Sequence, residues 1–65
     1  MINPNFAFLK DKKKIEEAIQ INNEFQNVYM NCDEWSYEDC IYYIRLSMKP
    51  FYLTNDEYEI VLLML

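Results

Sequence analysis

The chain contains no glycine, and this absence limits the folds open to it more than any other feature of the sequence. Glycine reaches backbone conformations that other residues adopt only at a cost, so tight hairpins, phosphate-binding loops and dinucleotide-binding turns depend on it. Helices joined by short polar loops have no such need. We therefore expect an all-α fold for these 65 residues.

The helix around which the rest of the chain is organised is predicted in its middle, at residues 36–48. Ser36 is a good N-cap, and Asp39 stands at the position of a capping-box acid. Pro50 disfavours the α conformation at Lys49 and so ends the helix. On a helical wheel the predicted core side of this segment consists of Tyr37, Cys40, Ile41, Ile44 and Met48.

Two further helices are predicted on either side of the central one, at about residues 11–31 and 54–65. Asp11 is a plausible N-cap for the first, and Thr54 with Glu57 forms a capping box for the second. The apolar side of the first helix gathers Ile15, Ala18, Ile19, Phe25 and Tyr29, flanked by Ile21 and Val28. We expect residues 1–65 to form a single small three-helix domain with an N-terminal aromatic arm at residues 1–10.

Two local questions stay open in the sequence. Asn3 before Pro4 fits a helix cap with proline at the first helical position, so the arm is either a helical turn or an irregular or extended segment. Asn22 and Gln26 lie four residues apart near the apolar side of the first helix. Either they lie at the solvent-exposed edge of this side, or they pair across a helix interface and fix its register.

The charge of the chain is distributed unevenly. Residues 1–14 hold four lysines against one aspartate, whereas the rest carries ten acidic residues against Arg45 and Lys49. We expect an acidic surface that repels phosphate backbones, and hence no direct binding of nucleic acid. The predicted acidic surface consists of Asp33, Glu34, Glu38, Asp39, Asp56, Glu57 and Glu59.

The second and third predicted helices carry more apolar residues than one core-facing side needs. Tyr42, Tyr43 and Leu46 lie opposite the predicted core side, and the third helix is apolar all round after Glu59. Either the rest of the chain covers these side chains, or they form a contact surface, for which tyrosine is well suited. We expect self-association, with a homodimer as the simplest form. The predicted partner-binding residues are Tyr42, Tyr43, Leu46, Leu62, Leu63 and Leu65.

Catalytic chemistry has little support in this composition. The chain has no histidine, and its carboxylates and two cysteines form no recognisable catalytic set. Two cysteines alone make a poor zinc site, and the acidic cluster lacks the ligand spacing of a calcium loop. We expect a non-enzymatic protein with no catalytic residues, no cofactor and no metal. The longest apolar run, at residues 60–65, is too short to span a membrane, and no secretion signal is visible, so we expect a cytoplasmic location.

Together these features favour a small acidic interaction protein that binds and modulates, most simply by inhibition, a larger host protein. The abundance of Asn, Ile, Lys and Tyr is typical of AT-rich coding DNA, which suggests a phage or mobile-element origin. Two alternatives remain: an acidic nucleic-acid mimic that occupies the DNA- or RNA-binding groove of a host enzyme, and a structural subunit that assembles with itself.

Overall fold

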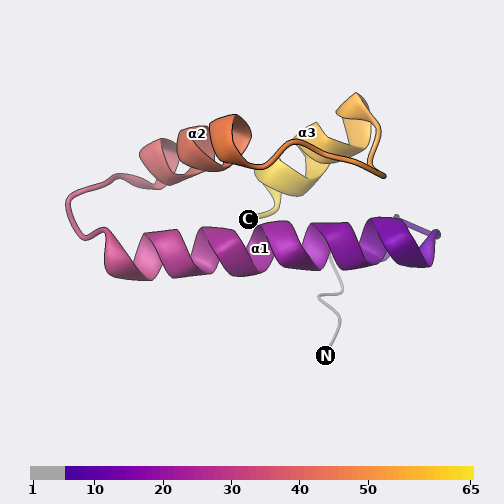
Figure 1. Ribbon diagram of the computed structural model, residues 1–65, viewed down its shortest axis with the longest axis horizontal. Helices are drawn as coiled ribbons and strands as arrows, with labels where there is room; N and C mark the ends of the chain where they lie inside the picture. The colour runs from indigo at the N-terminus through magenta and orange to yellow at the C-terminus, as the bar shows by residue number, and fades with distance from the viewer. Residues whose placement is uncertain (1–5) are drawn as a thin grey trace.

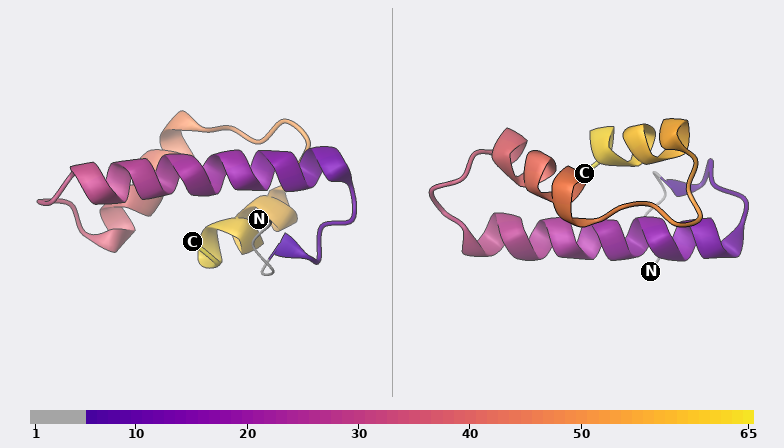
Figure 2. Two further views of the ribbon diagram at one scale, coloured as in Figure 1. Left: turned by 90° about the horizontal axis from the view of Figure 1, so that it is seen from below. Right: turned by 45° about the horizontal axis from the view of Figure 1, so that its top comes forward.

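The computed structural model describes residues 6–65 and contains three helices in that range (Figure 1). They are α1 (Lys12–Asn31), α2 (Tyr37–Ser47) and α3 (Asn55–Leu63). The prediction of a small all-α fold is confirmed. The long α1 forms one layer, and α2 and α3 follow one another along the same side of it as the second layer (Figures 1 and 2).

Side chains cap the start of every helix in the described residues, as the sequence predicts. The Asp11 carboxylate accepts a hydrogen bond from the Lys13 N–H at 2.9 Å. Ser36 caps α2 and Thr54 caps α3, each in a complete capping box in which the N-cap N–H donates back to the carboxylate of Asp39 or Glu57. These bonds satisfy backbone N–H groups that the first turn of a helix leaves without a partner.

The third helix is shorter than predicted. Its last residue is Leu63, with Met64 as the C-cap, whereas the sequence suggests that it continues to residue 65. The Met64 N–H reaches the Val61 carbonyl at 3.0 Å, and the Leu65 N–H reaches the Leu62 carbonyl at 3.4 Å. Bonds of this tighter spacing commonly close the last turn of a helix.

The core lies between the two layers. It is formed by Phe6, Leu9, Ala18, Ile21, Phe25, Val28, Cys40, Ile44, Leu53, Tyr58, Val61 and Leu62. The apolar side of α1 is rotated from the prediction, since Ile21 and Val28 lie at its centre and Tyr29 is half exposed. Tyr29 instead stacks on Phe25, with ring centroids 5.7 Å apart, and packs edge-on against Tyr37 at the start of α2.

The N-terminal arm is part of this core. Phe6 and Leu9 are buried, and the Leu9 N–H donates to the Phe6 carbonyl at 3.0 Å, which closes a single turn. Of the predicted alternatives, the turn is therefore correct for residues 6–9, which lie close to α3 in Figure 2. The predicted Asn3–Pro4 cap lies outside the described residues.

The amides on α1 are not core residues. Asn22 is half-buried and Gln26 is exposed, so both lie at the edge of the apolar side. This placement supports the interpretation that they lie at its solvent-exposed edge. The predicted alternative is that the two amides form a buried pair that fixes the register of a helix interface. Neither amide is buried in the single chain.

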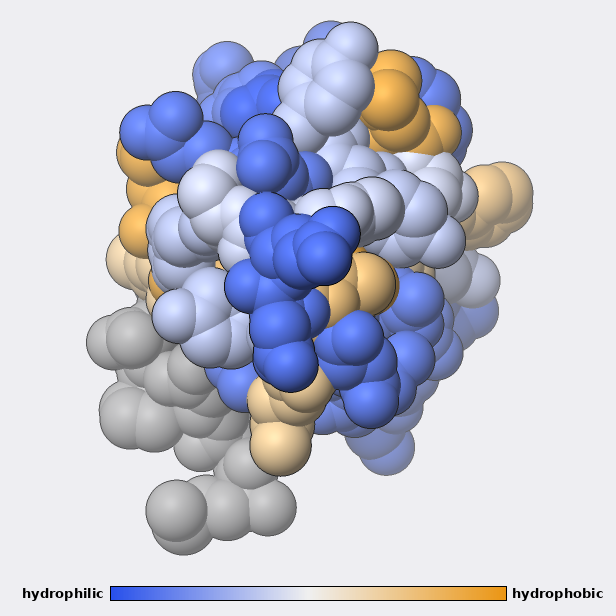
Figure 3. Space-filling model, turned by 90° about the vertical axis from the view of Figure 1, so that its left-hand side faces the viewer, coloured by the Kyte–Doolittle hydropathy of each residue, from blue (hydrophilic) through white to orange (hydrophobic). Residues whose placement is uncertain are grey.

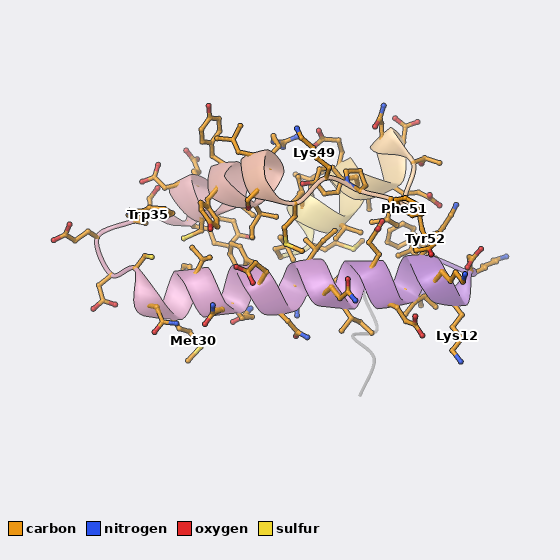
Figure 4. All side chains as sticks on the ribbon, viewed as in Figure 1. Lys12, Met30, Trp35, Lys49, Phe51 and Tyr52 are labelled. Atoms are coloured by element: carbon orange, nitrogen blue, oxygen red, sulfur yellow. The ribbon has the colours of Figure 1, made fainter. Side chains whose placement is uncertain are left out.

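The segment between α2 and α3 is held against α1 by a carboxylate. Glu17 accepts backbone hydrogen bonds from three consecutive residues: Phe51 at 2.8 Å, Tyr52 at 3.0 Å and Leu53 at 2.9 Å. The ammonium of Lys13 lies 5.3 Å from the centre of the Tyr52 ring, a cation–π contact that adds to this anchor. Figure 4 shows Phe51 and Tyr52 above the first turns of α1.

Polar contacts join α2 to α3. The buried hydroxyl of Tyr58 donates to the Met48 carbonyl at 2.8 Å and lies 3.4 Å from the Ile44 carbonyl. The Ile44 carbonyl already accepts from the Met48 N–H, so the main effect of the hydroxyl is to satisfy the Met48 carbonyl at the end of α2. Arg45 forms an ion pair with Glu59, which connects the two helices on their exposed side.

Candidate protein-binding surface

The outer side of α2 carries a shallow apolar hollow. Its lining consists of Trp35, Asp39, Tyr42, Tyr43 and Leu46, which we call the α2 face, and its volume is about 310 Å³. The side chains of Tyr42 and Leu46 are 62 % and 60 % exposed. Exposed apolar side chains that gather in one patch make a candidate contact surface, and tyrosine and tryptophan are enriched at protein interfaces.

The pattern of α2 itself produces this face. Cys40 and Ile44 are fully buried against α1, so residues half a turn away point outward. Tyr42 and Leu46, four residues apart, therefore stand next to one another on the solvent side. Trp35 extends the face beyond the helix start, since its ring lies 5.6 Å from that of Tyr43.

The predicted partner-binding residues do not form one surface. Tyr42, Tyr43 and Leu46 are exposed together on the α2 face, so of the two predicted alternatives the rest of the chain does not cover them. Leu63 is 84 % exposed on α3, outside the lining of the hollow. The assignment of Leu62 to the surface is wrong, because Leu62 packs in the core.

Leu65 is half-buried, and its backbone carbonyl accepts a hydrogen bond from the Tyr37 hydroxyl. It is therefore engaged within the chain, at the point where α3 ends close to α2. A helix that is apolar all round gives no periodicity from which its buried side can be read, and for this reason the sequence pattern does not separate Leu62 and Leu65 from Leu63.

Trp35 is the residue of the α2 face that the sequence prediction missed. It directly precedes the N-cap Ser36, at the position where a hydrophobic staple would pair it with Cys40, yet Trp35 is 42 % exposed while Cys40 is fully buried. Helical spacing could not have found it, because Trp35 precedes the N-cap Ser36 and lies outside α2. Its contact with Tyr43 is visible only in the structure.

The predicted acidic surface is divided into two parts. One part surrounds the start of α2, where Asp33, Glu34, Glu38 and Asp39 are all exposed. Seen from the end that carries the α1–α2 connection, the centre of the molecule is hydrophilic, with residues of intermediate hydropathy around it (Figure 3). Asp39 belongs to both this acidic group and the α2 face.

The other acidic residues lie on α3, and two of them are neutralised within the chain. Glu57 binds the Lys14 ammonium at 2.9 Å and caps its own helix, and the Thr54 backbone bond with the Lys14 bond lowers the pKa of Glu57. The Arg45 guanidinium lowers the pKa of Glu59 in the same way. Only Asp56 of this group has no such pairing among the described contacts.

The described residues give little support for catalysis or metal binding. Both cysteines are free, and burial raises the pKa of the Cys40 thiol, which therefore stays protonated rather than reactive. Within residues 6–65 no group of three or more His, Cys, Asp or Glu side chains is placed to hold a metal ion. Over the same range, no helix has both the length and the apolar character needed to cross a membrane.

Comparisons with known proteins identify no relative. The chain matches no protein-family model, and neither the curated proteins nor the solved structures gave a significant match. The function must therefore be argued from the α2 face and the charges around it.

Proposed function

We propose that this chain is a small acidic, non-enzymatic interaction protein that binds a larger protein partner and inhibits or otherwise modulates it. The observation that carries the proposal is the α2 face: an exposed aromatic and aliphatic hollow on a helix whose opposite side is buried at Cys40 and Ile44. Protein-binding hot spots are enriched in tryptophan and tyrosine, because these side chains bury a large area at low entropic cost.

The charges around the α2 face suggest the character of the partner. Asp39 lines the hollow itself, and Glu34 and Glu38 are exposed next to it in the sequence. A partner segment with an apolar centre and a basic flank would match this arrangement, and its association would be faster at low salt.

The nucleic-acid mimic is the weaker proposal. A mimic needs a continuous row of unpaired negative charges to replace phosphates. Here Glu57 and Glu59 are bound to Lys14 and Arg45, so the α3 carboxylates are partly neutralised by the chain's own cations. The hollow beside the remaining acids is lined chiefly by aromatic and aliphatic side chains, which a phosphate mimic does not require.

The test is affinity capture of the partner from the native host, with matched substitutions in the chain. Leu46→Asp places a charge at the centre of the α2 face and should weaken capture at least about tenfold, the effect of losing one buried leucine. Met30→Asp makes the same kind of change at a side chain that is 73 % exposed and points away from α2 (Figure 4), and it should have no effect.

Two results would contradict the proposal. Equal loss of capture with Leu46→Asp and Met30→Asp would mean that the α2 face is not the contact surface. Loss of capture on adding salt, together with loss on neutralising Asp33 and Glu34 but none with Leu46→Asp, would favour the mimic instead.

A further inference from the structure

Four residues on and just after α2 are spaced symmetrically, so that their intervals are the same when read in either direction. Asp39, Tyr42, Leu46 and Lys49 follow one another at intervals of three, four and three residues, with an acid at one end and a base at the other. Intervals of three and four keep Asp39, Tyr42 and Leu46 on one side of α2. Lys49 follows the extended C-cap Met48, so it lies just beyond the helix, near the C-terminal end of α2 (Figure 4).

We infer that the α2 face is occupied by a second copy of this chain, with the two α2 helices antiparallel about a two-fold axis at the level of Ile44. In this register Tyr42 of one copy meets Leu46 of the second copy. Asp39 meets Lys49 of the second copy. Each contact occurs twice, as a two-fold interface requires.

Charge fixes the direction of the two helices. A parallel pair would bring Asp39 next to Asp39 and Lys49 next to Lys49, and like charges in contact disfavour that arrangement. The antiparallel pair joins opposite charges at both ends, and it also sets the positive end of each helix dipole beside the negative end of the other.

The residues involved are free to make these contacts. The Ser36 N–H binds only the Oδ2 atom of Asp39, at 3.2 Å, which leaves Oδ1 for an ammonium group. Arg45, the other cation of this segment, is already bound to Glu59. Lys49 is exposed, and it is therefore the cation available to Asp39 of a second copy.

The interface is small, and the dimer is correspondingly weak. A stable interface of standard size covers roughly 800 Å² on each partner. That is about a sixth of the 4804 Å² surface of this chain, and the outer side of one eleven-residue helix offers less. Each copy also carries a net charge of −5, which opposes association.

The dimer has a consequence for the proposed function. Self-pairing hides the same hollow that would receive a larger partner, so the two events exclude each other, and a dilute chain is the form competent to bind. The pairing itself does not rest on the proposed function; only this competition does.

The test is sedimentation equilibrium of the purified full chain between about 1 µM and about 1 mM, the range expected for a small interface. The wild type should pass from monomer to dimer over this range. Leu46→Asp should stay monomeric throughout, and Met30→Asp should behave as the wild type. A wild type that is monomeric throughout, or equal effects of the two substitutions, would overturn the inference.

The antiparallel register is tested by charge. Lys49→Glu sets a carboxylate against Asp39 of the second copy and should weaken the dimer about tenfold, since two pairs change from attraction to repulsion. Lys10→Glu makes the same change in net charge at an exposed site outside the face and is the matched control. Adding Asp39→Asn to Lys49→Glu should restore part of the loss, because the repulsion is removed while the asparagine oxygen can still accept from Ser36.

Equal weakening by Lys49→Glu and Lys10→Glu, or no recovery in the double variant, would refute this register. Circular dichroism of each variant shows whether the helices are retained. Because these measurements use the chain alone, their failure is distinct from a failure to capture a larger partner.

Discussion

Glu17 offers the sharpest test of how this fold is held together. Its carboxylate accepts hydrogen bonds from the N–H groups of Phe51, Tyr52 and Leu53, 34 to 36 residues away in the sequence. Glu17→Ala removes all three acceptors at once. The exposed N–H groups of Phe51 and Tyr52 can turn to water, but that of the buried residue Leu53 is less able to do so.

The expected loss of stability follows from this difference in access to water. We assign no loss to the two exposed bonds and count the third as a hydrogen bond to a charged group, which gives a loss of about 2 kcal/mol. A domain of this length is stable by roughly 3–10 kcal/mol, so the loss is a large share of the total. An unfolding entropy of about 2.1 cal/mol/K per residue converts it to a fall in Tm of about 15 °C.

The assay is urea and thermal unfolding followed by circular dichroism, with Glu16→Ala as the matched control. Glu16 is exposed on the same turn of α1, so its substitution has the same effect on helix propensity and net charge. If the free energies of unfolding of the two variants agree within about 0.5 kcal/mol, the contacts of Glu17 contribute nothing and the reasoning is wrong.

Three further predictions follow from the packing and the ion pairs. Tyr58→Phe removes the hydroxyl that binds the Met48 carbonyl and should cost about 1 kcal/mol in urea unfolding, whereas a cost near zero would mean that water replaces it. Phe6→Ala leaves a cavity in the core and should cost about 3–5 kcal/mol; a loss below about 1 kcal/mol would show that the arm is not docked in solution. Since the pKa values of Glu57 and Glu59 are lowered in the folded state, the stability they add is complete above their ordinary value of 4.5 and is lost as the pH falls below it through the lowered values. Thermal unfolding between pH 7 and pH 3 should show this decline, and a Tm that does not change over that range would contradict it.

The helix ends are the part of this fold that the sequence predicts best, because capping is a local interaction. Ser36 with Asp39 and Thr54 with Glu57 form capping boxes at the predicted positions, and Asp11 caps α1. Each of these contacts spans only two or three residues, so the pattern in the sequence contains the whole interaction.

Long-range partners are the part that the sequence does not predict. The helical wheel places Glu17 on the polar side of α1 and Lys14 at its solvated end, yet both bind groups more than 30 residues away. Which polar residues find such partners depends on where α3 docks, and no local pattern encodes that position. The burial of Leu62 is similar, since only the docked position of α3 distinguishes it from Leu63.

The α2 face was predictable in its centre and not at its edges. Tyr42, Tyr43 and Leu46 depart from the polar pattern expected opposite a packed helix side, and the structure exposes them together. Trp35 lies before the helix, where wheel arguments no longer apply, and only its packing against Tyr43 places it in the same surface.

The length of α1 also bears on the order in which the molecule assembles. Its C-terminal half meets α2 across a short connection, as the Phe25 and Tyr37 rings, 5.2 Å apart, show. Its N-terminal half meets α3 through Lys14 and Glu57, which are 43 residues apart in the chain. Closing the longer loop costs more entropy, so the α1–α2 hairpin should form first and serve as the template on which α3 arrives last. Folding kinetics should then show two phases. In the fast phase fluorescence is quenched as α1 and α2 pack together, and in the later phase the carboxyl-terminal third of the chain docks on them.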